Sequence, residues 1–200
     1  MDETRGFTDE TAAYWLRMLI YAAIAALVNT LFGVLAFVPA ALTKWIGCGT
    51  MAMKILALLK LFPANDRYRK AYILYGAMLA CTIATESLRL GTVLNSIASV
   101  LSLIAVYQEY YGHSELVTAK DPYLPGKWRG LFLWNIISAV VVGFASVTAV
   151  MIVALAGVDT TKITTLIVAV IMLPQYIVEI LYILYLKRSA ACFMNETEGF

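Results

Sequence analysis

An uncharged run of 26 residues, Met18–Thr43, is the feature that most constrains what this chain can fold into. A helix needs about 20 residues to cross about 30 Å of bilayer hydrocarbon. A secretory signal has a shorter apolar core behind a basic start, whereas the residues before this run are acidic (MDETRGFTDE). The run therefore predicts a retained transmembrane helix near the N-terminus.

The composition of the whole chain agrees with a membrane protein. Of the 200 residues, 62% are apolar and 14% are charged, whereas a soluble domain carries about 25% charged residues. A water-soluble fold could not bury this much apolar surface. We therefore expect one all-α integral membrane domain over residues 1–200, a multi-pass protein of a bacterial inner (plasma) membrane.

Uncharged segments separated by polar breaks predict five transmembrane helices. Their approximate ranges are 14–39, 68–88, 92–111, 128–156 and 163–186. The intervening segment TMAMKILALLKLF, residues 50–62, is apolar but short, and it carries Lys54 and Lys60 on one arc of a helix. It predicts an amphipathic helix lying in the membrane interface, where Lys54, Lys60 and the nearby Trp45 contact lipid or a partner.

The distribution of lysine and arginine predicts the orientation of these five helices. Basic residues concentrate in the segment after the first span, in the loop before the fourth span and at the C-terminal end of the fifth. Basic loops stay in the cytoplasm, so this scheme places the N-terminus outside and the C-terminus inside.

The fifth predicted span contains the main candidate site, in the sequence IMLPQYIVEILYILYLKRS. Pro174 is expected to kink the helix, because it lacks an N–H and clashes with the preceding turn. Gln175 lies at the loosened turn, and Glu179 lies in the apolar segment, where a carboxylate costs on the order of 2.5–3.5 kcal/mol. Glu179 is therefore expected to bind a cation, a proton or a substrate amine, or else to be a structural hydrogen-bonding group.

Other polar residues are weaker candidates. Asn29 lies in the middle of the first span and is a further candidate for a polar transport site. Glu109 and His113 lie at the cytoplasmic end of the third span, where a lone histidine is expected to be a surface residue. No second histidine or cysteine has the spacing of a metal ligand, so neither a metal nor another cofactor is expected.

Three functions remain open from the sequence. The first is a small transport or permeation protein, or the membrane subunit of a transport complex. The second is a non-catalytic scaffold that binds a partner or lipid, and the third is a membrane enzyme acting on lipids. The chain has no nucleotide-binding or catalytic signature, so we do not expect an enzyme. The expected partners are the bilayer and another membrane protein or further copies of the chain, but not nucleic acid.

Overall fold

The computed structural model describes residues 7–34, 39–87, 91–156 and 169–194. Helices occupy almost all of these residues, and the predicted all-α class is confirmed. The helices are α1 (Asp9–Val34), α2 (Ala40–Leu61), the short 3-10 turn η1 (Phe62–Ala64), α3 (Asp66–Ser87), α4 (Gly91–Val117), α5 (Leu124–Ala156) and α7 (Leu173–Met194).

Polar side chains fix where three of these helices begin. The hydroxyl of Thr8 accepts a hydrogen bond from the N–H of Thr11 (3.2 Å) at the start of α1. The side-chain oxygen of Asn65 accepts one from the N–H of Arg67 (2.8 Å) at the start of α3. The carboxylate of Asp121 accepts one from the N–H of Leu124 (3.3 Å) at the start of α5. Each bond satisfies a backbone donor that has no partner within its own helix.

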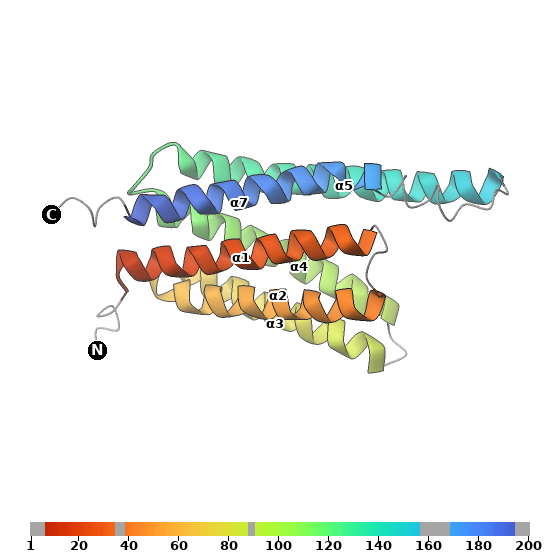
Figure 1. Cartoon of the computed structure of the whole chain (residues 1–200), viewed down its shortest axis with the longest axis horizontal. Helices are drawn as coiled ribbons and strands as arrows, with labels where there is room; N and C mark the ends of the chain where they lie inside the picture. The colour runs from red at the N-terminus through yellow and green to blue at the C-terminus, as the bar shows by residue number, and fades with distance from the viewer. Residues whose placement is uncertain (1–6, 35–38, 88–90, 157–168, 195–200) are drawn as a thin grey trace.

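The six long helices of the described chain form a closed ring. Each packs against the next along the chain, and α7 packs against both α5 and α1 (Figure 1). Neighbouring helices run in opposite directions. As a result, α1 and α7 lie side by side, and the start of α1 is at the same end of the bundle as the end of α7.

Two ion pairs show that the start of α1 and the end of α7 lie at the same end of the bundle. Asp9, at the start of α1, pairs with Lys120 in the loop between α4 and α5 (2.9 Å). Arg188, near the end of α7, pairs with the adjacent Asp121 (2.7 Å). The N–H of Tyr123 and the Arg188 guanidinium hold the pKa of Asp121 below its ordinary value. The predicted scheme put these two helix ends on opposite sides of a membrane, whereas the structure brings them together.

The physical reason is α2, which is longer than the sequence indicated. The predicted interfacial helix at 50–62 is the second half of a 22-residue helix that begins after Pro39 and runs antiparallel to α1. A proline is tolerated just before a helix, because an N–H there would have no partner within the helix. The predicted first span, 14–39, ends at this proline, whereas α1 is described as far as Val34. Residues 35–38 lie outside the described chain.

Among the residues that the structure describes, three helical segments are long and apolar enough to cross a membrane: Asp9–Val34, Ala40–Ala64 and Leu124–Ala149. The predicted spans at 68–88, 92–111 and 128–156 coincide with α3, α4 and α5, although α4 continues to Val117. The predicted fifth span, 163–186, is described only from residue 169 onward.

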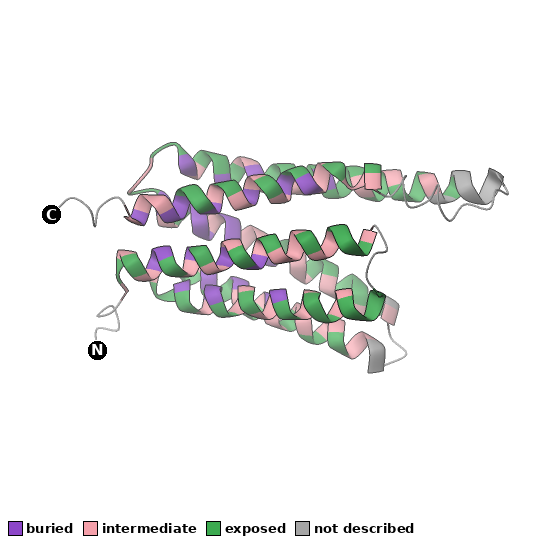
Figure 2. Ribbon diagram, in the orientation of Figure 1, coloured by how far each residue is buried: buried purple, intermediate pink, exposed green. Residues whose placement is uncertain are grey.

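Buried side chains gather in the half of the bundle that contains both termini (Figure 2). In the opposite half, large apolar side chains face outward, among them Phe144 (74% exposed) and Val147 (62%) on α5. Such an outer surface suits hydrocarbon rather than water, and in lipid the packed half is held by close contacts and hydrogen bonds.

Candidate functional site

A cavity of about 210 Å³ lies inside the ring and is lined by α1, α2, α4, α5 and α7. We call it the central cavity. Its apolar lining includes three alanines from α1, Met51 from α2 and Val106 from α4. Its polar lining consists of Thr50, Lys54, Tyr110, Asn135, Gln175 and Glu179. A mostly apolar hollow with a few convergent polar groups is the usual form of a small-molecule site.

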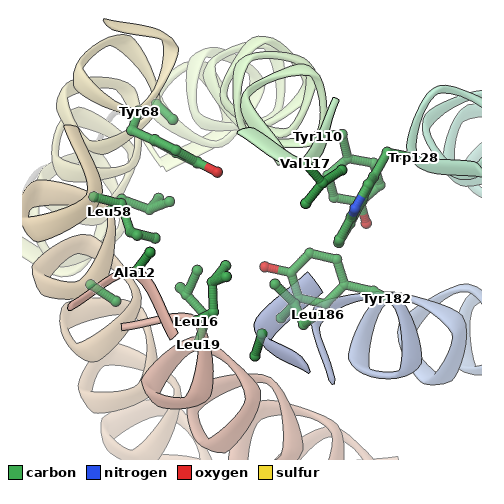
Figure 3. Packing of buried hydrophobic residues seen from close by; sticks show 14 of the residues in the cluster. Ala12, Leu16, Leu19, Leu58, Tyr68, Tyr110, Val117, Trp128, Tyr182 and Leu186 are labelled. Atoms are coloured by element: carbon green, nitrogen blue, oxygen red, sulfur yellow. The ribbon is translucent and has the colours of Figure 1, made fainter. Parts of the chain in front are cut away.

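A fully buried carboxylate lies beside the cavity. Glu109 on α4 is 0% exposed and accepts hydrogen bonds from the hydroxyls of Tyr75 (2.5 Å) and Tyr182. The ammonium of Lys54 lies 2.8 Å from Oε2, the same carboxylate oxygen that accepts from Tyr75. Figure 3 shows Tyr182 on α7 and Tyr68 on α3 pointing their hydroxyls into the interior of the ring. Helices α2, α3 and α7 thus each supply a donor to one carboxylate on α4.

His113 extends this group toward the chain termini. It lies one turn after Glu109 on α4, and its Nδ1 is 2.9 Å from the hydroxyl of Tyr68. Its Nε2 is 3.8 Å from the Glu109 carboxylate and has no hydrogen-bond partner among the described residues. The Trp128 ring covers the imidazole at 4.6 Å, and its own N–H bonds Ser189 (3.2 Å). The expectation that His113 is a surface residue is wrong, because it is 0% exposed.

Lys54 connects the buried group to the cavity. Its ammonium donates to the Tyr75 hydroxyl (3.1 Å) as well as to Glu109, and lies over the rings of Tyr75 (4.5 Å) and Tyr182 (5.3 Å). The same side chain lines the central cavity. A desolvated ammonium is stabilised by both the carboxylate and the aromatic faces. Lys54 therefore faces the protein interior, where Glu109 and two tyrosines surround its ammonium in place of the lipid or partner contact that the sequence predicted.

Glu179 differs sharply from Glu109. It also lines the central cavity, but it makes no hydrogen bond and no salt bridge with any residue that the structure describes. A carboxylate in an apolar protein normally has donors around it or loses its charge. The structure therefore contains two acids at one centre, of which one is saturated with protein donors and one is not.

The other two predicted site residues of the fifth span, Gln175 and Pro174, face different surfaces of α7. Gln175 lines the cavity beside Glu179, and its side-chain oxygen accepts a hydrogen bond from Ser138 on α5 (2.9 Å). Pro174 lies in the first turn of α7, where its missing N–H leaves no helical bond unmade, and it faces an outer groove with Trp134 and Ile137. Residues 169–171 are helical, Met172 forms a turn and α7 begins at Leu173, so the helix is interrupted just before Pro174, where the sequence predicted a kink.

Asn29 does not line the cavity. Its side-chain nitrogen donates to the backbone carbonyl of Thr43 (2.8 Å), so that it joins α1 to the beginning of α2. Trp45 is 66% exposed near the same end of α2, whereas Lys60 is exposed at the other end of that helix. The predicted contact residues Trp45 and Lys60 therefore do not share one surface with Lys54.

Sequence reasoning missed Glu109, His113, Tyr75 and Tyr182 as members of a site. One signal was present, because the spacing of Glu109 and His113 puts them on the same face of a helix. The pattern was ambiguous, however. Apolar residues around this pair and tyrosines on the neighbouring helices are as typical of an aromatic belt at the membrane interface as of a buried site.

No group of three His, Cys, Asp or Glu side chains in the described ranges has the arrangement of a metal site. The comparisons add no relative: no family model matches the chain, and no curated protein or solved structure matches it significantly. Within the described residues, the fold and site therefore define this protein as a helical bundle with three candidate membrane-spanning helices and a mostly apolar central cavity that holds a few polar side chains.

Proposed function

We propose that this chain is a multi-pass membrane protein that carries a small solute through its central cavity. The observation that supports it is a cavity of about 210 Å³ with charged and amide side chains, enclosed by helices whose outer faces are apolar. Ionisable residues inside membrane proteins generally face such cavities and mark substrate or ion pathways. Soluble enzymes bury polar pockets too, but they do not cover the outside of the pocket with exposed apolar side chains.

The proposal includes six membrane-crossing helices, with both termini in the cytoplasm. Basic side chains cluster at the end of the bundle that holds the termini: Lys60, Arg67, Arg69, Lys70, Lys120, Lys127, Arg129, Lys187 and Arg188. At the opposite end, Lys44 is the basic residue of the described chain. The excess of lysine and arginine on the cytoplasmic side sets the orientation of membrane proteins.

Cysteine labelling distinguishes this topology from the five-span scheme. In a variant with Cys48, Cys81 and Cys192 replaced by serine, Ala40→Cys should react with a membrane-impermeant maleimide applied to intact cells, because α2 begins on the outer side. Lys60→Cys should react only after the membrane is opened. The five-span scheme puts both positions inside, so protection of Ala40→Cys in intact cells would contradict six spans.

Filling the cavity tests the transport proposal. Ala26 of α1 lines the cavity, and leucine there should occupy space that the solute needs. We expect purified Ala26→Leu protein in liposomes to lose most solute flux. The matched control is Ala139→Leu on α5, whose side chain is exposed on the outside of the bundle. Candidate solutes are compared by stopped-flow light scattering, and equal flux through both variants would count against the cavity as the pathway.

A lipid-binding scaffold is the second candidate. The basic cluster at the end with the termini supports it, since a basic surface next to a membrane attracts anionic headgroups. The docking residues would be those exposed in that cluster, such as Lys60 and Arg69, rather than Lys54. Loss of co-purifying anionic lipid on charge reversal at these two exposed positions, with flux unchanged, would favour the scaffold.

A further inference from the structure

Two carboxylates and one ammonium control the charge at the centre of the ring. Lys54 lines the cavity, but its ammonium lies 2.8 Å from Glu109 and 3.1 Å from the Tyr75 hydroxyl. Glu109 therefore already neutralises this positive charge. Lys54 and Glu179 are the charged residues of the described cavity lining, and no salt bridge joins them. With both acids ionised, the centre carries one uncompensated negative charge, on Glu179.

From this arrangement we propose that the central cavity binds one small alkylammonium ion at Glu179, in competition with a proton. The inference rests on the proposed function and names its substrate class. The positive charge of the ligand replaces the proton that would otherwise neutralise Glu179. The balance is one ammonium ion bound for each proton released from the carboxyl group.

The lining favours an organic cation over an alkali ion. Beside the carboxylate lie alanines, Met51 and Val106, which suit an alkyl group. The rings of Tyr110 and Tyr182 line the same space as a stacked pair, 5.4 Å apart and 18° from parallel. Cations bind over such aromatic faces, whereas a bare metal ion needs a full shell of oxygen ligands. The volume also exceeds the need of a single water, about 10–15 Å³, many times over.

Other titratable groups around Glu179 come from three elements. Lys54 faces it from α2, Tyr110 from α4, and Tyr176 and Tyr182 lie on α7 itself. The lining from α1 is apolar, and α5 contributes the neutral amide of Asn135. Lys54 is thus the one fixed cation in this set. Glu179 can bind the cation of a ligand only because Glu109 pairs with Lys54 and keeps it from pairing with Glu179.

Binding is tested by titrating the full-length protein in detergent with propylammonium, with sodium as the inorganic control. We expect the apparent Kd to rise about tenfold for each unit of falling pH in the range where Glu179 takes up its proton. The heat of binding should change with the ionisation enthalpy of the buffer as expected for one released proton. Glu179→Gln should weaken binding at least tenfold, the loss of one charge-assisted contact.

A second pair of variants tests the role of Lys54. Glu109→Gln should also weaken binding, because Lys54 is released to pair with Glu179. Lys54→Met combined with Glu109→Gln removes both charges, and binding should recover toward wild type, since Glu179 is again unpaired. If Glu109→Gln fails to fold, the double variant alone decides: weak binding in a folded double variant contradicts the charge balance.

The outcomes separate this inference from the transport proposal. Equal binding of propylammonium by wild type and Glu179→Gln, or no binding at all, would overturn the inference. Stronger binding of sodium than of propylammonium would also overturn it. Ammonium binding without flux in liposomes would leave the site standing and remove transport. If the protein binds no ammonium but carries a neutral or anionic solute, and Ala26→Leu blocks this flux, transport would stand and the ammonium site would be removed.

Discussion

Glutamine in place of Glu109 is expected to lower the free energy of unfolding by about 3–5 kcal/mol. Glu109 is fully buried, and its carboxylate is the ion-pair partner of the Lys54 ammonium at 2.8 Å. The amide keeps the shape and can still accept from the hydroxyls of Tyr75 and Tyr182. It does not neutralise Lys54, which is then a largely desolvated charge without its counter-ion. Equilibrium unfolding in mixed detergent and SDS micelles measures the change.

The control for this prediction removes the ammonium as well. Lys54→Met with Glu109→Gln leaves no ammonium without its partner and restores the wild-type situation in which Glu179 alone is unpaired, so the double variant should be closer to wild type than Glu109→Gln alone. Glu179 provides a second check, because Lys54 can move to it once Glu109 is neutral. Glu179→Gln should therefore cost more stability in the Glu109→Gln background than in the wild type. Additive effects of the two glutamines would show that Lys54 does not move.

The helices that sequence reasoning located well are those marked by long uncharged runs. The predicted ranges rest on the constraint that a helix crossing a membrane must satisfy its own backbone and needs a continuous apolar stretch. Helices α3, α4 and α5 lie close to these ranges, and of the three, within the described residues, α5 is long and apolar enough to cross a membrane. The all-α class follows from the same constraint. It did not depend on knowing any contact between helices.

The misplacement of α2 has one cause, which is Lys54. A lysine in an apolar segment has the same local pattern whether it points to headgroups or to a buried carboxylate. Its partner Glu109 lies two helices further along the chain, so no local pattern joins them. With Lys54 and Lys60 placed at the interface, the predicted helix is limited to residues 50–62, and the predicted scheme has no crossing between Pro39 and residue 68.

The candidate site was predicted in part for a related reason. Glu179 and Gln175 stand out because each is a polar residue in an apolar segment, and both line the cavity. Asn29 stands out in the same way but bonds the backbone of α2. Depth along a helix is readable from sequence, whereas the direction in which a side chain points depends on how the neighbours pack. Tyr75 and Tyr182 became part of the site only through that packing.

Glu179→Gln should reduce solute flux in liposomes by about 10- to 150-fold, while the protein still folds. The factor corresponds to one charge-assisted contact of about 1.5–3 kcal/mol, with about 1.4 kcal/mol for each factor of ten. The fold should survive because Glu179 has no hydrogen-bond partner among the described residues, so its neutral isostere leaves no protein donor unpaired. Unfolding in SDS should show little loss of stability, in contrast to Glu109→Gln.

Glu179→Asp is the matched variant that separates charge from position. It retains the carboxylate but shortens the side chain by one methylene, so it should keep more flux than glutamine does. If Glu179→Asp and Glu179→Gln are equally inactive, reach into the cavity matters more than charge. Full flux through Glu179→Gln would mean that the solute does not depend on this carboxylate. The cavity would then be a pathway only if Ala26→Leu still blocks it, because Ala26 tests the space and Glu179 tests the charge within it.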